Sequence, residues 1–196
     1  MYKHTQSGFS LVETLVAITI LLIVIVGPMT ISVSTSRSTS FSSEQVVAFF
    51  LAQEGIEATQ KARDDLILNA FLPSSDGNYS ATPWSTFSDS VTGPYANCYS
   101  SAGCGMEMTN SGGGVVSSPV VCTGSSCRMY YDSTRDIARY NLDTLGTVTP
   151  YSRNVRFVEL SPNEIRVIST VQWRTGSQRN FQEVQLETSL FNVYGN

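Results

Sequence analysis

Residues 9–29 read FSLVETLVAITILLIVIVGPM, a stretch of 21 positions in which apolar side chains are almost continuous. As an α-helix with a rise of about 1.5 Å per residue, this stretch would span about 30 Å, the thickness of a bilayer hydrocarbon core. Lys3 and His4 precede it, and the positive-inside bias keeps such residues in the cytoplasm. We therefore expect a single-pass protein of the cytoplasmic (inner) membrane, with its N-terminus inside and the bulk of the chain exported.

One carboxylate, Glu13, lies near the start of this apolar run. Deep in a bilayer it would cost about 2.5 to 3.5 kcal/mol on insertion scales, so we expect a partner that compensates its charge. A glutamate that reaches the membrane surface without a partner is the alternative. An ordinary secretory signal is disfavoured, because the apolar run is long and continues through Gly27 and Pro28 to Ile31.

The order Gly8, Phe9 and then Glu13, leading directly into a hydrophobic helix, resembles the processing signature of type IV prepilins. The resemblance implies cleavage after Gly8 by a prepilin peptidase, methylation of the new terminus at Phe9, and residence among membrane lipids before assembly. It implies as partners other pilin subunits and the pilus assembly machinery in the membrane. It also implies that Glu13 pairs with the Phe9 amine of a neighbouring subunit. Gly8 suits a protease because it has no Cβ, and a paired buried charge costs far less than an unpaired one.

After the apolar run, apolar positions recur with helical spacing from Val46 to Leu66. We expect one long helix from about Phe9 to about Asn69, interrupted near Gly27–Pro28, because proline lacks an amide donor. The Ser/Thr-rich tract 32–43 would belong to this helix, with a flexible linker as the alternative. Within the helix, Ala52 and Gly55 share a face and would allow a sheet or a second helix to approach closely.

The C-terminal part of the chain predicts β-structure, beyond a turn cluster at Leu72–Gly77. Three runs of strand length, 155–160, 165–174 and 181–191, predict an antiparallel meander with one apolar face. The predicted fold class is α+β and type IV pilin-like. A long N-terminal helix, membrane-spanning in its first half, packs on a C-terminal antiparallel sheet. The expected segments are a cleaved cytoplasmic leader (1–8), a membrane and filament-core part (9–29), an amphipathic continuation (30–72) and an exported β-rich head domain (73–196).

Four cysteines, Cys98, Cys104, Cys122 and Cys127, lie in the expected exported part, where disulfides can form. Their spacing is symmetrical about the glycines at 112–114, so a hairpin turn there would give nested bridges, Cys104–Cys122 and Cys98–Cys127, which we slightly favour. The local pairs Cys98–Cys104 and Cys122–Cys127 are nearly as well supported. Zinc sites prefer tighter spacing, and no histidine lies nearby, so we expect no metal and no other cofactor.

Composition and charge argue against several classes of function. The net charge is −4 with only 14% charged residues, which disfavours a nucleic-acid partner without excluding one. The only histidine, His4, belongs to the expected leader, so no histidine base would remain in the mature chain. The glycines at 112–114 are not followed by the lysine of a phosphate-binding loop. We expect no enzymatic activity.

These patterns together favour a structural subunit of a type IV pilus, minor, initiating or tip-proximal, which would be assembled from the membrane into an extracellular filament. A pseudopilin of a type II secretion or DNA-uptake system is the nearest alternative. A membrane-anchored adhesin or binding domain outside any filament is the second. In that second case aromatic side chains could line a binding site, although packing in the core and loops is their commoner role; the candidates are Tyr79, Trp84, Phe87, Tyr95 and Tyr99.

Overall fold

The first element of the computed structural model is the helix α1, Leu11–Phe71, with 61 residues. The structure describes residues 8, 10–71, 82–108, 119–134, 139–174 and 180–193. The chain forms two compact units, Met1–Glu44 and Gln45–Asn196, and α1 contributes to both. The predicted turn cluster at 72–77 lies outside the described residues.

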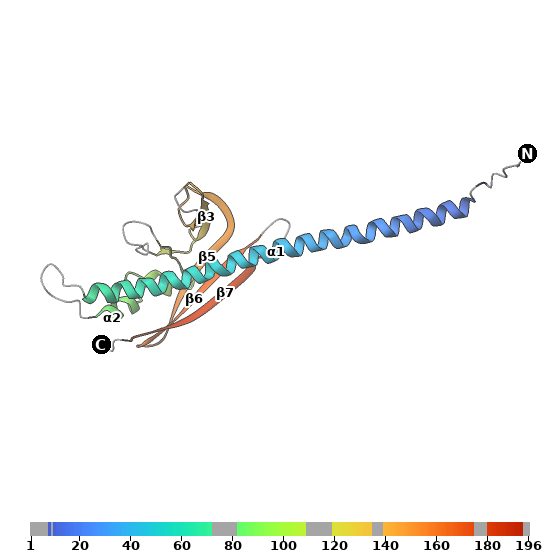
Figure 1. Cartoon of the computed structure of the whole chain (residues 1–196). Helices are drawn as coiled ribbons and strands as arrows, with labels where there is room; N and C mark the ends of the chain where they lie inside the picture. Colours follow the sequence, from blue (N-terminus) through green and yellow to red (C-terminus); the bar gives the residue numbers. More distant parts are fainter. Residues whose placement is uncertain are drawn as a thin grey trace, which may run out of the picture. The chain divides into compact units, whose positions relative to one another are not determined.

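The predicted interruption of α1 near Gly27–Pro28 is wrong, because Pro28 lies inside the helix. Figure 1 shows α1 as one uninterrupted helix. Proline removes only its own amide from the hydrogen-bond ladder, and the neighbouring backbone groups can remain helical. The Thr30 hydroxyl donates to the Gly27 carbonyl at 2.8 Å. The Ser/Thr tract is helical too, with Thr39 Oγ1 donating to the Thr35 carbonyl at 3.0 Å, so the linker alternative is also wrong.

The C-terminal unit is built on an antiparallel sheet around β5, Thr147–Ser161. On one side β5 pairs with β6 (Glu164–Trp173), which pairs in turn with β7 (Gln182–Phe191). This arrangement confirms the predicted meander and the α+β, pilin-like fold class. On the other side β5 pairs with β3 and with β1, which continue to β4 and β2; these strands are β1 (Cys104–Gly105), β2 (Val120–Val121), β3 (Arg128–Asp132) and β4 (Arg139–Asn141).

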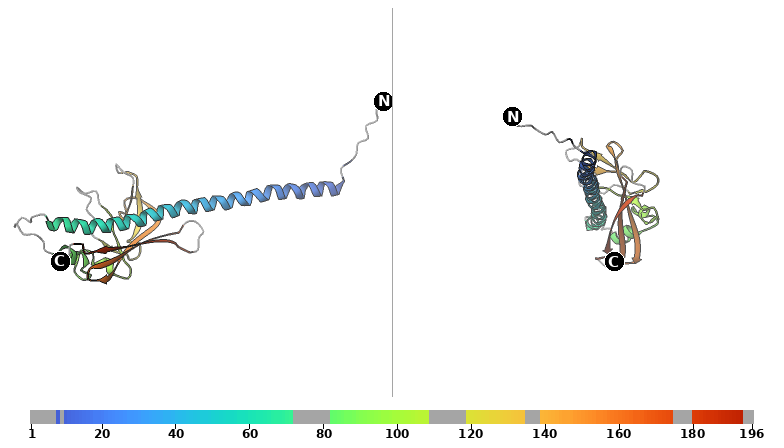
Figure 2. Two further views of the ribbon diagram at one scale, coloured as in Figure 1. Left: turned by 60° about the horizontal axis from the view of Figure 1, so that its bottom comes forward. Right: turned by 90° about the vertical axis from the view of Figure 1, so that its right-hand side faces the viewer.

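The second half of α1 packs on one face of this sheet, as Figure 2 shows. The side chains that α1 buries are mostly small, including Ala48, Ala52 and Ala58. At Gly55 an added Cβ would collide with the Ser169 hydroxyl and would lie 3.2 Å from a Val155 methyl group. The prediction that small residues here allow a sheet to approach closely is therefore confirmed.

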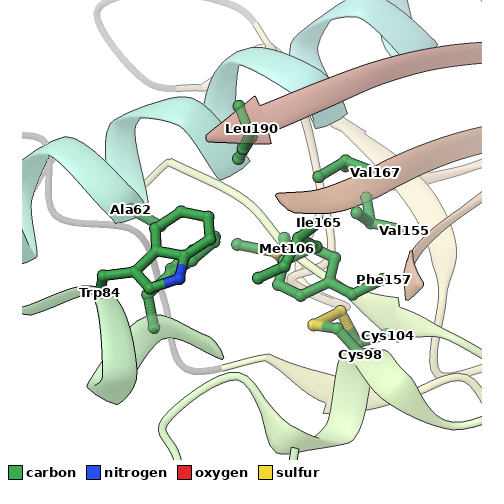
Figure 3. Close-up of a cluster of buried hydrophobic side chains, with 11 residues drawn as sticks. Ala62, Trp84, Cys98, Cys104, Met106, Val155, Phe157, Ile165, Val167 and Leu190 are labelled. Carbon is green, nitrogen blue, oxygen red and sulfur yellow. A yellow bond between two sulfur atoms is a disulfide. The ribbon is translucent and has the colours of Figure 1, made fainter. Parts of the chain in front are cut away.

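The hydrophobic core lies between the sheet, α1 and the short helices α2 (Pro83–Ser88) and η1 (Ala96–Tyr99). Its buried side chains come from each of these elements, and Figure 3 draws them together. Trp84 of α2 also donates its indole N–H to the Pro162 carbonyl, at 2.8 Å, in the turn between β5 and β6. The members of the core are Ala62, Trp84, Phe87, Cys98, Cys104, Met106, Val155, Phe157, Ile165, Val167 and Leu190.

The favoured nested disulfides are wrong, because the structure pairs Cys98 with Cys104 and Cys122 with Cys127. The antiparallel approach of β1 and β2 was anticipated, but its register differs by one residue. Cys104 lies opposite Val121, so Cys122 follows one position later and its side chain points to the other face of the ladder. Cys104 instead reaches Cys98 of η1 in the core, where both are fully buried.

Candidate functional site

The sequence-predicted site lies where α1 begins. The Ser10 carbonyl accepts hydrogen bonds from the backbone amides of Glu13, at 3.0 Å, and Thr14, at 3.2 Å, which form the first turn. Gly8 is exposed, and a Cβ added to it would meet no atom within 4 Å, so its backbone is sterically accessible. Phe9, the other predicted processing residue, lies outside the described residues. The structure therefore places Gly8 and Glu13 but does not test their roles.

Glu13 is the acidic residue of the first turn of α1, where the partial positive charge of the helix N-terminus favours a carboxylate. The large side chains beside it are apolar and exposed: Leu11 is 76% exposed, Val12 68% and Leu15 57%. In the sequence, Glu13 is the only charged side chain between His4 and Arg37. It is thus a lone charge at one end of an apolar helical surface.

Among the described residues of the N-terminal unit, no other part of the chain covers the apolar surface of α1. Every large apolar side chain from Leu11 to Ile31 is at least 50% exposed. A helix that is apolar on all sides belongs in a membrane or in the core of a larger assembly. By length and composition, α1 is long and apolar enough to cross a membrane.

Hydroxyl groups within the apolar segment are satisfied by the helix itself. Thr14 donates to the Leu11 carbonyl at 2.9 Å, and Thr19 donates to the Val16 carbonyl at 2.8 Å. Such internal bonds lower the cost of placing a hydroxyl in an apolar medium. Glu13 cannot be neutralised in the same way, because its charge needs a cationic partner rather than a backbone acceptor. The helix therefore presents one group whose burial depends on something outside the segment.

In the C-terminal unit, the aromatic candidates for a binding site pack in and around the core. Trp84 and Phe87 are buried, while the rings of Tyr95 and Tyr99 lie 6.5 and 5.4 Å from that of Phe157. Tyr79 lies outside the described residues. Among the four that are described, the packing interpretation is confirmed.

Two groups near these aromatics have shifted pKa values with structural causes. A hydrogen bond from the Thr92 hydroxyl, followed by backbone amides of Thr92 and Val91, lowers the pKa of Asp89 from 3.8 to about 2. Burial, reinforced by Glu159 and Asp89, raises the pKa of Tyr99 far above its ordinary value. The hydrogen bonds to Asp89 hold the turn that follows α2, and the Tyr99 phenol is neutral. In the described part of the chain, no group of three or more His, Cys, Asp and Glu side chains could hold a metal ion.

An ion pair between a buried arginine and a partly exposed glutamate, which we did not predict from the sequence, joins α1 to the sheet. Arg153 is only 1% exposed; its guanidinium lies 3.0 Å from the Glu54 carboxylate, donates to the Leu51 carbonyl at 3.0 Å and donates to the Met106 carbonyl at 2.7 Å. A signal was present in the sequence. Arg153 shares the parity of Val155 and Phe157 along β5, which assigns it to the apolar face.

These features define an α+β protein whose N-terminal helix is apolar on all sides and carries one carboxylate near its start. Residues 3–27 match the model of the prokaryotic N-terminal methylation motif, the leader signature of type IV prepilins. No curated protein and no solved structure matches the chain. The matched segment contains Gly8, Phe9 and Glu13, so the resemblance noted in the sequence is confirmed, and it supports a pilin- or pseudopilin-type protein.

Proposed function

We propose that this protein is made as a membrane-inserted precursor, is cleaved between Gly8 and Phe9, and acts as a structural subunit of a type IV pilus. The match of residues 3–27 to the methylation motif carries the proposal. The motif implies processing by prepilin peptidase and assembly with other pilin subunits. The exposed apolar side chains from Leu11 to Ile31 support it, because they need a bilayer before assembly and neighbouring helices afterwards.

Pairing between Glu13 and the Phe9 amine of a neighbouring subunit would set the register of assembly. Cleavage creates that amine, and methylation keeps it cationic. An unpaired carboxylate in an apolar bundle is costly, whereas a hydrogen-bonded ion pair recovers much of that cost. A subunit that docks one turn out of register would leave both charges unpaired, so the same interaction attracts the correct position and rejects the others.

We propose a minor, initiating or tip-proximal position for the subunit. The region from Pro73 to Asn141 is large and contains the cysteines, which suits a specialised display surface more than a repeated filament wall. A major subunit would dominate filaments sheared from cells, so quantitative mass spectrometry of sheared filaments separates the two positions. A pseudopilin would carry the same leader; loss of secretion or DNA uptake on deletion, with pili intact, would favour that alternative.

Mass spectrometry of the N-terminal peptide of the native protein tests the pathway. A peptide that begins at Phe9 with a methylated amine is the expected result. Retention of Met1, or cleavage at another position, would contradict the proposal and favour a membrane-anchored binding domain. A Gly8→Leu variant is the matched control, because it should accumulate the uncleaved precursor without altering the sequence of the mature chain.

A further inference from the structure

The strand β7 forms an open edge of the sheet in the C-terminal unit. In the described part of the chain it pairs with β6 alone, beside which Figure 1 draws it. The register is unbroken from Glu164 opposite Phe191 to Trp173 opposite Gln182. Every second residue of an edge strand directs its N–H and C=O groups away from the sheet. The other side of β7 therefore carries a row of donors and acceptors that can pair with a further strand.

β7 lacks most of the features that normally prevent an edge strand from pairing with another strand. Proteins protect open edges with short strands, prolines, lysines or bulges. β7 has ten residues, no proline, glycine or lysine, and no register shift against β6. In contrast, the β3–β5 and β5–β6 pairings both contain irregularities. The charged side chains of β7, Glu183 and Glu187, make this edge negative but do not block the pairing of a further strand.

The inner face of β7 is only partly covered. Leu190 is buried, whereas Val184, Leu186 and Thr188 are half-buried. Their strand partners on β6 in the same rows, Val171, Ser169 and Val167, are fully buried. The apolar layer therefore thins out at this edge, and alternate apolar side chains from an added strand would extend it.

The charge on the outer face of β7 favours a positively charged partner strand. From Phe181 to Val193 the chain has two carboxylates and no lysine or arginine. Glu183 accepts a hydrogen bond from the Gln172 amide, at 2.6 Å, and Glu187 accepts one from the Gln185 amide, at 2.7 Å. These donors are neutral amides. The arginines of the same face belong to β6 or directly follow it, where Arg166 lies opposite Ser189 and Arg174 lies over the Phe181 ring, so β7 itself brings only negative charge to the open edge. A second copy of β7 would bring further glutamates to this row, whereas lysine or arginine side chains would complement it.

We propose that β7 accepts an extended segment of a partner protein, added as a further strand, in which apolar side chains alternate with lysine or arginine. Main-chain hydrogen bonds would supply affinity, the half-buried apolar rim would hold the inward side chains, and Glu183 and Glu187 would select the basic ones. The proposal depends only on the C-terminal unit. It can fail while the leader-processing pathway stands, and the N-terminal peptide test can fail while this surface stands.

A synthetic peptide that alternates valine and lysine tests the proposal on the full chain in detergent. Bound peptide should slow hydrogen–deuterium exchange of the β7 amides, while β5, paired on both sides, stays unchanged. The double variant Glu183→Gln/Glu187→Gln should weaken binding about tenfold, since two exposed charge pairs are lost. Glu57→Gln is the matched control, because Glu57 is also exposed and accepts a hydrogen bond from a glutamine amide, that of Gln53.

Two further probes separate strand addition from other kinds of attachment. A valine–lysine peptide that is N-methylated at successive central residues cannot pair through either edge and should not bind. A valine–glutamate peptide should bind at least about tenfold more weakly than the lysine peptide. Unchanged exchange in β7, equal binding of the N-methylated peptide, or equal binding of the glutamate peptide would overturn the proposal. Concentration-dependent protection of β7 without peptide would also overturn it, in favour of a second copy at this edge.

Discussion

At the scale of single residues, the distance between α1 and the sheet is set by side chains that are absent or small. Gly55 lies against Ser169 and Val155, where a Cβ would have no room, and Ala52 and Ala58 are fully buried on the same helix. Glycine costs about 1 kcal/mol relative to alanine inside a helix, so its use here indicates that close packing outweighs local helix stability. The same closeness brings the Leu51 carbonyl within reach of Arg153.

Replacing Gly55 with leucine should lower the free energy of unfolding of the C-terminal unit by about 1 to 3 kcal/mol. The added side chain would force α1 away from β5 and β6, which is the usual cost of overpacking. Thermal unfolding of the full chain in detergent, followed by the fluorescence of the buried Trp84 and Trp173, would measure the loss. Gly27→Leu is the control, since a Cβ at Gly27 meets no atom within 4 Å. Equal stability of the Gly55 variant and the unmodified protein would show that the sheet can retreat without cost.

The ion pair between Arg153 and Glu54 should show strong coupling in a double-mutant cycle. Glu54→Gln leaves the buried guanidinium without its counter-charge, and Arg153→Met removes that charge together with two carbonyl contacts. We expect a coupling energy of at least about 1 kcal/mol between the two changes in denaturant unfolding. The helix pair of Lys61 and Asp65 is the comparison, because both its side chains are about a third exposed whereas Arg153 is buried; at most about 0.5 kcal/mol is expected for it. Additive effects at Arg153 and Glu54 would mean that Arg153 acts only through its bonds to carbonyls.

At the scale of elements, strands and sites could be predicted where the sequence shows a regular alternation or a contiguous motif. β6 and β7 alternate between apolar and polar residues and are bounded by turn residues, so their meander could be predicted. β1 and β2 have two residues each, which is too few to show a period; β1 pairs with the long β5, and β2 pairs with β1. Residue identity was also misleading: Pro28 indicated a break that the helix does not have, and the charge of Arg153 concealed its burial. The processing signature around Glu13 could be recognised because its residues lie close together in the sequence.

The pairing of the cysteines could not be predicted from the sequence. A shift of one residue in the register of β1 and β2 changes which cysteines can meet. Cyanogen bromide cleaves after Met106 and Met108, between the two local pairs. Under non-reducing conditions the fragments that contain Cys98–Cys104 and Cys122–Cys127 should therefore separate, whereas nested bridges would keep them linked. Replacing Cys98 and Cys104 by alanine should cost about 2 kcal/mol from loop closure and more from lost core packing, while the Cys122 and Cys127 pair should cost less.

At the scale of the whole molecule, the two units differ in how they satisfy their apolar surface. The unit from Gln45 onward has a core of its own, which includes Phe157, Ile165 and Trp84. In the unit up to Glu44, the described part from Leu11 onward is a single segment of α1, and its large apolar side chains from Leu11 to Ile31 are exposed. No folding of that segment on itself can bury them. Its stability must come from lipid or from other helices, which is the physical basis for proposing a subunit that moves from a membrane into an assembly.

Glu13→Ala tests whether assembly depends on the lone carboxylate. If the Glu13 carboxylate pairs with the Phe9 amine of a neighbour, its loss leaves a buried cation uncompensated at a cost of several kcal/mol. Because 1.4 kcal/mol corresponds to a factor of ten, the amount incorporated into sheared filaments should fall at least about tenfold. Membrane insertion and cleavage at Gly8 should continue, which separates an assembly defect from a processing defect. Glu57→Ala, an exposed carboxylate in the C-terminal unit, should assemble normally. Unchanged incorporation of the Glu13 variant would mean that apolar packing alone sets the register of the helices.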